Sequence, residues 1–230
     1  MKKKLVILTG AGISAESGLK TFRDSDGLWE QFRIEDVATP MAWQKDPVLV
    51  LKFYNQRRKD VIQAKPNAAH HELAKLEDYF NVTIITQNID DLHERAGSKN
   101  IIHLHGEILK SRSSDDPDLL YECKGDIAIG EKCELGSQLR PHVVWFHEAV
   151  PMMEIASEEA AQAEIFLVIG TSLQVYPAAG LINYAPHFSK KFLVDPVIPE
   201  FTRIHNLEFV EARATVGVPP LVERLIKEFA

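Results

Sequence analysis

The stretch LVILTGAGISAES, residues 5–17, decides the fold that the sequence predicts. Its first four residues form a continuous apolar run, which is typical of a strand that is covered on both faces. The turn after it carries Gly10 and Gly12, and Ala15 stands where a third glycine is often found. Such a turn lets the backbone come close to a phosphate at the start of the next helix. A plain tight turn from strand to helix has the same spacing, so this signal alone leaves both interpretations open.

Other parts of the chain repeat this alternation of strand and helix. Apolar runs predict further strands at 82–85, 165–169, 191–194 and 206–210, and helical patterns cover 67–78 and 154–163. Strands that alternate with helices form a parallel sheet with helices on its faces, so the predicted fold class is α/β. Ligands of such sheets bind at the carboxyl ends of the strands. Function is therefore expected in the polar turns that follow the strands.

Two segments do not follow the alternation. Residues 27–66 look helical, with Asp46 as an N-cap and Pro47 in the first turn of a helix. Residues 109–139 are polar and show no sustained periodicity. We expect both segments to form a small inserted lobe. The larger domain then consists of residues 1–26, 67–108 and 140–230.

Composition and charge exclude several classes of protein. The chain has 230 residues, with 26 Lys and Arg against 33 Asp and Glu, a net charge of −7. The signs are interspersed, which disfavours a nucleic-acid binder. Two cysteines are too few for a disulfide scaffold and indicate a reducing, cytoplasmic setting. No apolar run reaches the length of a signal peptide or a membrane span, so no membrane partner is expected. A monomer is favoured, although the sequence does not settle the oligomeric state.

Polar side chains follow two of the predicted strands. Thr21, Phe22 and Arg23 lie downstream of the glycine turn and either close over a nucleotide or form a surface ion pair beside a core Phe. The segment QNIDD, residues 87–91, offers amides and carboxylates that suit ribose hydroxyls and an amide-bearing ring. The same residues also suit the cap of the helix that follows them.

The segment HLHG, residues 103–106, carries two histidines. On a strand their side chains share a face, and His142 or His147 would complete a metal site. Alternatively, one imidazole is a general base, because histidine titrates near neutral pH. A structural role is open for each histidine on its own.

Taken together, these segments resemble the sirtuins, NAD-dependent protein lysine deacylases. The matching elements, in order, are GAGIS (10–14), TFRD (21–24), TQNID (86–90), HG (105–106), RPHVVWF (140–146), GTS (170–172) and ATVG (214–217). The resemblance implies a Rossmann-like large domain with NAD between the lobes. NAD is then consumed, and the products are nicotinamide, O-acyl-ADP-ribose and free lysine.

The resemblance also implies roles for individual residues. His105 would be the general base on a ribose hydroxyl, and Asn88 and Asp90 would complete the catalytic set. The implied NAD-binding residues are Gly10, Ala11, Gly12, Ala15, Thr21, Phe22, Arg23, Gln87, Asn88, Asp90, Gly170, Thr171, Ser172 and Ala214. The acylated lysine of a protein or peptide would lie along Val143, Val144, Trp145 and Phe146, paired as an added strand.

Tyr54 and Arg57 are the candidate residues that bind the acyl group. At positions i and i+3 they project from one helix face and can converge on a carboxylate. They match the pair of the sirtuin subclass that removes succinyl, malonyl and related groups. The alternative within residues 57–59 is a solvated basic face.

The sequence departs from the family at the zinc site of many sirtuins. Ser111, Ser113 and Ser114 stand where the first cysteine pair is expected, and only Cys123 and Cys133 follow. Because a zinc site needs four good ligands, we predict no zinc.

Two smaller departures are His147, where glycine is usual, and Lys20, where proline is common. The alternatives to a deacylase with desuccinylase and demalonylase preference are a non-catalytic NAD or ADP-ribose sensor and a metal-dependent hydrolase that uses His103 and His105.

Overall fold

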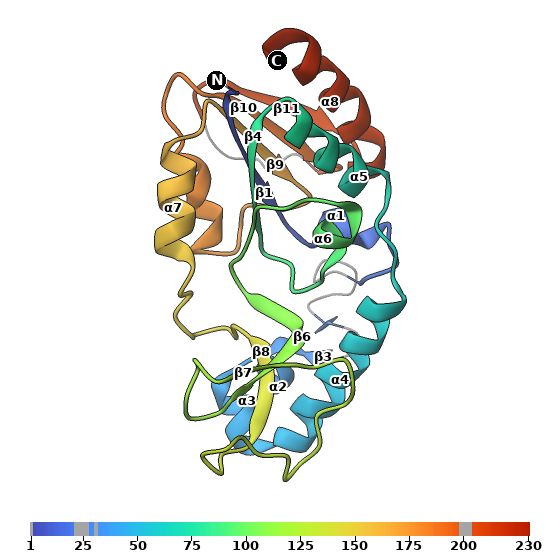
Figure 1. Ribbon diagram of the computed structural model, residues 1–230, viewed down its shortest axis with the longest axis vertical. Helices are drawn as coiled ribbons and strands as arrows, with labels where there is room; N and C mark the ends of the chain where they lie inside the picture. Colours follow the sequence, from blue (N-terminus) through green and yellow to red (C-terminus); the bar gives the residue numbers. More distant parts are fainter. Residues whose placement is uncertain (1, 21–27, 30–31, 198–203) are drawn as a thin grey trace.

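The computed structural model of the chain describes residues 2–20, 28–29, 32–197 and 204–230. Its larger part is built on a six-stranded sheet with the order β11-β10-β9-β1-β4-β5, in which all neighbouring strands are parallel (Figure 1). The strands are β1 (Lys4–Thr9), β4 (Asn81–Thr86), β5 (Ile101–His103), β9 (Ile165–Ile169), β10 (Lys190–Asp195) and β11 (Leu207–Glu211). The α/β fold with a parallel sheet is therefore confirmed, and β5 adds a short strand to the five expected ones.

Helices cover both faces of this sheet. Leu5 and Ile7 of β1 pack on one face with α5 (Ala68–Lys75) and α8 (Ala214–Phe229). Val6 and Leu8 pack on the other face with α7 (Met153–Ala161) and the 3-10 helix η2 (Ala178–Asn183). Since neighbouring side chains of a strand point to opposite faces, this double cover explains why the strand sequences are apolar without interruption.

A smaller lobe lies at the other end of the molecule (Figure 1). It contains the helices α2 (Ile34–Val37), α3 (Pro40–Lys45) and α4 (Pro47–Gln63), and the hairpin of β2 (Leu28–Trp29) and β3 (Phe32–Arg33). It also contains an antiparallel sheet of order β7-β6-β8, formed by β6 (Gly106–Ser113), β7 (Leu120–Glu122) and β8 (Leu139–Val143). Asp46 caps α4, as predicted, because its Oδ1 accepts a hydrogen bond from Leu49 N at 2.9 Å.

The segment 109–139 is more regular than its sequence indicates. It contributes most of β6 and all of β7, and β6 and β8 reach beyond it to Gly106 and Val143. The domain boundaries given above stay a prediction, and the lack of sustained periodicity in this segment did not indicate its strands.

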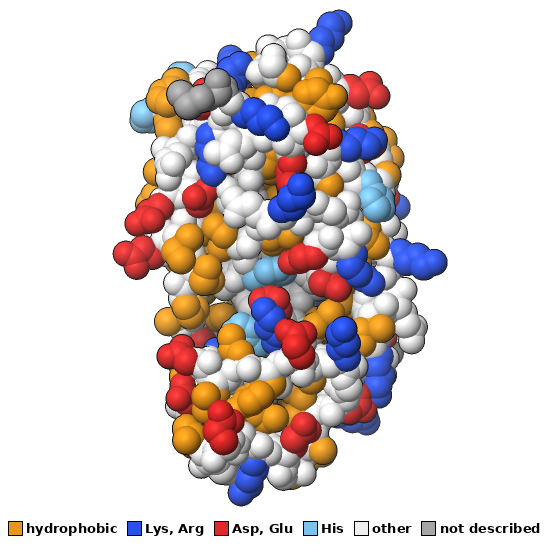
Figure 2. Space-filling view, in the orientation of Figure 1, with side chains coloured by type: hydrophobic (Ala, Val, Ile, Leu, Met, Phe, Trp, Pro, Cys, Tyr) orange, Lys and Arg blue, Asp and Glu red, His pale blue; other side chains and the backbone are white. Residues whose placement is uncertain are grey.

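The surface carries both signs of charge. On the face drawn in Figure 2, acidic and basic side chains intermingle over both lobes. Among the helices of the described ranges, none has the length and apolar character needed to cross a bilayer.

Candidate active site

A cavity of about 620 Å³ lies where the carboxyl ends of β1, β4 and β9 face the small lobe. This volume is typical of sites for small molecules and cofactors. Its lining includes every predicted site residue that the structure describes: Gly10, Ala11, Gly12, Ala15, Tyr54, Arg57, Gln87, Asn88, Asp90, His105, Val143, Val144, Trp145, Phe146, Gly170, Thr171, Ser172 and Ala214. The predicted residues Thr21, Phe22 and Arg23 lie outside the described residues.

The glycine turn packs backbone against backbone. Gly12 N donates to Gly170 O at 2.8 Å, and Gly10 N donates to Ile169 O at 3.0 Å. A Cβ atom on Gly12 would come within 2.7 Å of Gly170 Cα, so a side chain at this position would force the two turns apart. The helix α1 (Ala11–Ala15) starts directly at this turn. The close packing keeps the bare backbone of the turn on the cavity wall, which fits the approach of a phosphate group.

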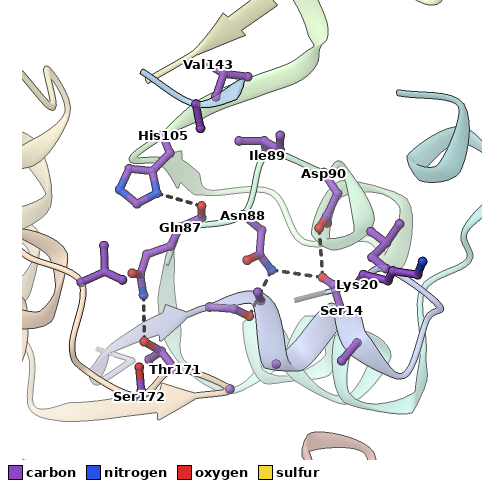
Figure 3. Close-up of a pocket in the computed structure, with 18 of the residues that line it drawn as sticks. Ser14, Lys20, Gln87, Asn88, Ile89, Asp90, His105, Val143, Thr171 and Ser172 are labelled. Atoms are coloured by element: carbon purple, nitrogen blue, oxygen red, sulfur yellow. Dashed lines mark hydrogen bonds between the residues drawn. The ribbon is translucent and has the colours of Figure 1, made fainter. Parts of the chain in front are cut away.

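The amide of Asn88 is held by α1 (Figure 3). Its Nδ2 donates to Gly10 O at 3.2 Å and to Ser14 Oγ at 3.1 Å. Ser14 Oγ in turn donates to Asp90 Oδ2 at 3.0 Å, and Leu92 N donates to Asp90 Oδ1 at 3.1 Å. Burial raises the pKa of Asp90. Asp90 therefore binds the first N–H of α6 (Leu92–Ala96), whose N-cap Asp91 makes no side-chain cap, and it also joins the cluster around Asn88.

His105 has a defined tautomer. Its Nδ1 lies 2.9 Å from Gln87 O, and a carbonyl oxygen only accepts hydrogen bonds (Figure 3). The proton is therefore on Nδ1, and Nε2 carries the lone pair. Burial lowers the pKa of His105. A neutral imidazole with a free lone pair at the cavity wall is what a general base requires.

His103 does not share a strand face with His105. The strand β5 ends at His103, and His105 lies in the turn before β6. The Nε2 of His103 lies 2.6 Å from Glu94 Oε1, and although burial opposes its charged form, this contact raises the pKa of His103. The alternative in which the two histidines share a strand face as a metal pair therefore does not hold.

The two candidate acyl-binding residues, Tyr54 and Arg57, lie on α4 and line the cavity. The side chains of Tyr54 and Arg57 are buried, with 1% and 6% of their surface exposed. The Tyr54 ring lies 6.4 Å from the Trp145 ring, measured between centroids. Burial raises the pKa of Tyr54, so its phenol keeps its proton. The two side chains do not form a solvated basic face, which was the other interpretation of residues 57–59.

The segment after β8 is fixed by an ion pair that the sequence did not indicate. Arg140 Nη1 and Nη2 donate to the two carboxylate oxygens of Glu148 at 2.7 and 3.1 Å. Trp145 N also donates to Glu148 Oε2 at 2.7 Å, and the Arg140 guanidinium lies 3.3 Å from the centre of the Trp145 ring. Arg140 belongs to the RPH motif, but its partner is eight residues away on the next turn, and such spacing has no periodic signature.

The N–H groups of Val144, Trp145 and Phe146 in the segment are all engaged. Val144 N donates to His105 O at 2.9 Å and Phe146 N donates to Ala38 O at 3.0 Å, in addition to the bond from Trp145 N. Its last turn contains His147, whose φ of 72° lies in the left-handed region that glycine adopts at low cost. The departure from glycine at position 147 therefore places a side chain on a strained backbone at the cavity wall.

Serine and cysteine side chains pair in the small lobe. Cys133 Sγ lies 3.4 Å from Ser113 Oγ, and both cysteines are buried free thiols. Ser113 Oγ also accepts hydrogen bonds from Asp115 N and Asp116 N at 3.2 Å each. Within the described ranges, no three His, Cys, Asp or Glu side chains lie close enough to hold a metal ion. Hydrogen bonds and apolar packing around Leu51 and Ile127 stabilise this region.

Comparison with known proteins gives consistent results. The model of the Sir2 family matches residues 10–177. An NAD-dependent protein deacylase of Bacteroides thetaiotaomicron is 50% identical over 230 residues, which cover 97% of this chain and 98% of the relative. One of Helicobacter pylori is 50% identical over 225 residues, covering 98% of each chain.

Two solved structures are also similar. The crystal structure of a Sir2 homologue in complex with NAD is 40% identical, with a TM-score of 0.89, over 100% of this chain and 91% of that chain. A mutant Sir2 homologue in complex with ADP ribose is 40% identical, with a TM-score of 0.90, over 98% of this chain and 93% of that chain.

Proposed function

This chain belongs to the Sir2 family and is an NAD-dependent protein deacylase, and we propose that it prefers lysines that carry acidic acyl groups such as succinyl and malonyl. The observation that carries the proposal is the position of Tyr54 and Arg57. Both side chains are buried on α4 and line the same cavity as His105. A buried guanidinium beside a protonated phenol offers charge-assisted and neutral hydrogen bonds to one ligand carboxylate. An acetyl group makes no such contacts, so we expect weaker deacetylation.

The described residues fit NAD at the other end of the cavity. The turns at Gly12 and Gly170 leave bare backbone on the wall, and an added Cβ would close this approach. We propose that these turns, with Ala11, Ala15 and Ala214, hold the pyrophosphate, and that Gln87, Thr171 and Ser172 contact the ribose part. The existence of complexes of Sir2 homologues with NAD and with ADP ribose supports NAD as the ligand. NAD, when bound, supplies an electrophilic ribose carbon on loss of nicotinamide.

We assign separate roles to His105, Asn88 and Asp90. His105 Nε2 accepts a proton from a ribose hydroxyl, because Nδ1 already donates to Gln87 O. Asn88 has both N–H donors engaged with Gly10 and Ser14, which leaves its amide oxygen to meet the sugar or the nicotinamide amide. Asp90 keeps Ser14, and through it Asn88, in place.

The peptide part of the substrate is assigned to residues 143–146. Since the N–H groups of Val144, Trp145 and Phe146 are engaged within the protein, a peptide strand laid along them donates to carbonyl oxygens. Shielding of the reacting groups from water is a further role of this apolar segment. The free thiols of Cys123 and Cys133 support a cytoplasmic setting.

The experiment compares Arg57→Met with the parent protein on matched succinyl-lysine and acetyl-lysine peptides, with NAD saturating. A hydrogen bond to a charged group contributes about 1.5–3 kcal/mol, so kcat/KM for the succinyl peptide should fall about 10- to 150-fold. The acetyl peptide should change less than about threefold. The matched control is Lys59→Met, an exposed position on the same helix. Equal losses on both peptides would refute the acyl preference, and no nicotinamide release from NAD with the succinyl peptide would refute the desuccinylase assignment.

A further inference from the structure

We propose that His93, which packs against His70, is a positioning residue that holds Asn88 against the glycine turn through a buried chain of hydrogen bonds. Neither histidine lines the cavity. Both are buried in the large domain, with 1% and 0% of their surface exposed. The inference concerns the NAD end of the site and does not depend on the acyl preference.

The first links of the chain join His93 to the ends of β1 and β4. His93 Nε2 lies 3.1 Å from Thr9 Oγ1, and Thr9 Oγ1 donates to Thr86 Oγ1 at 2.9 Å. Asn88 N donates to the same Thr86 oxygen at 3.1 Å. Because the only hydroxyl proton of Thr9 goes to Thr86, Thr9 accepts from His93. His93 therefore carries its proton on Nε2 and a lone pair on Nδ1.

The next links join His70 to the N-cap of α5. Asn67 N donates to His70 Nδ1 at 3.3 Å, so the proton of His70 is on Nε2. The two imidazole rings lie 4.9 Å apart, edge to face. Among the described residues, His70 Nε2 and His93 Nδ1 have no hydrogen-bond partner, and both atoms are buried. The contact between the two histidines is therefore ring packing, and the hydrogen-bonded chain to Asn88 begins at His93.

Asn67 and Asn88 both hydrogen-bond to α1 or to the turn before it. Asn67 Nδ2 donates to Ile13 O at 2.8 Å and to Ser17 Oγ at 3.0 Å. Asn88 Nδ2 donates to Ser14 Oγ and Gly10 O. Hydrogen bonds tie His93 to Asn88 through the ends of β1 and β4, and ring packing joins His93 to His70. Together these contacts fix the distance between the glycine turn and the loop that carries Asn88.

Burial supports the neutral state of both rings. It lowers the pKa of His70 to about 4 and the pKa of His93 well below its ordinary value. Two buried imidazoles cost more desolvation free energy than two leucines of similar volume would. The hydrogen bonds that His93 and His70 each make offset part of this cost and specify one geometry, which apolar packing does not.

The test compares the variants His93→Leu and His93→Gln in steady-state kinetics and in nicotinamide exchange. Leu removes both polar atoms, whereas the Gln amide offers a donor and an acceptor. We expect H93L to raise KM for NAD about tenfold, the effect of one or two lost hydrogen bonds, and to leave KM for the acyl peptide within about twofold. H93Q should recover most of the loss. His71→Leu, at the exposed neighbour of His70 on α5, is the matched control and should change neither constant.

The outcomes separate a positioning role from a merely structural one. A folded H93L with an unchanged KM for NAD would overturn the proposal, as would H93Q that performs no better than H93L. If H93L does not fold, Thr9→Val removes the central hydroxyl with little change in volume and should give the same selective increase in KM for NAD. Nitrogen NMR of the parent protein at pH 7 gives an independent answer, because both rings should be neutral with the proton on Nε2. A proton on Nδ1 of either ring contradicts the chain.

Discussion

Replacing Glu148 with Gln should destabilise the protein by about 2–3 kcal/mol. The Glu148 carboxylate accepts from both terminal nitrogens of Arg140 and from Trp145 N, and the Arg140 side chain is only 8% exposed. Removing one partner of a buried ion pair costs about 3–5 kcal/mol, because the other charge stays buried. Glu148 is 20% exposed and Gln keeps one acceptor oxygen, so the lower estimate applies.

Thermal and urea unfolding measure this effect. For a domain of this size, 2–3 kcal/mol corresponds to a decrease in Tm of about 4–12 °C. Glu158→Gln, at an exposed position on α7, is the matched control and should change the free energy of unfolding by less than about 0.5 kcal/mol. We also expect KM for the peptide to rise more than KM for NAD, because Glu148 fixes the backbone of Trp145.

The difference in the free energy of unfolding between the parent protein and E148Q should depend on pH. Burial opposes the charged form of Glu148, but its contacts with Arg140 and Trp145 outweigh burial and lower its pKa below 4.5. A lowered pKa stabilises the folded state above the ordinary value, and this contribution disappears as the pH falls through the folded value. The difference should be full at pH 7 and shrink below about pH 4.5. Equal stability of the two proteins at pH 7 would refute this account of the ion pair.

Three further predictions concern the site. Gly170→Ala should abolish measurable NAD binding in calorimetry, because its Cβ would lie 2.3 Å from Ile13 N at a φ of 64°; binding of normal affinity would show that the two turns need not touch. Because burial lowers the pKa of His105 below 6.5, kcat/KM should be flat from about pH 7 to 8 and fall only at a midpoint below 6.5, and a midpoint above 7 would contradict a neutral base. Dialysis against a chelator should leave activity and Tm unchanged, since Ser113 and not a thiol faces Cys133, and a loss that zinc restores would contradict the zinc-free prediction.

Strands that are covered on both faces were predictable from the sequence. Residues 165–169 form β9 with the bounds that the apolar run indicates, because every position of that strand meets a helix. The strands of the small lobe were not predictable in this way. β6 has charged residues at half-buried positions and serines at buried ones, and its partner β8 contains Pro141, which usually argues against a strand. Pro141 is tolerated because β8 lies at the edge of its sheet.

The candidate site was predictable where the strand ends themselves carry the side chains. The turns after β1, β4 and β9 meet at one edge of a parallel sheet, so Gly12, Asn88 and Thr171 had to converge. The partners of these residues were not predictable, because they depend on pairs from distant elements. Glu94 engages the Nε2 atom of His103, which a metal ion would otherwise use, and no periodicity in the sequence links the two residues.

The position of β1 in the sheet has a consequence for synthesis of the chain. Leu5 pairs with Ile165 on one side and with Val82 on the other, so β1 is synthesised long before one of its two neighbours in the sheet. At about 5–20 residues per second, this delay is roughly 10–30 s. Throughout that time the apolar run 5–8 has one unpaired edge, and the nascent protein depends on chaperones or on early pairing with β4 to avoid aggregation.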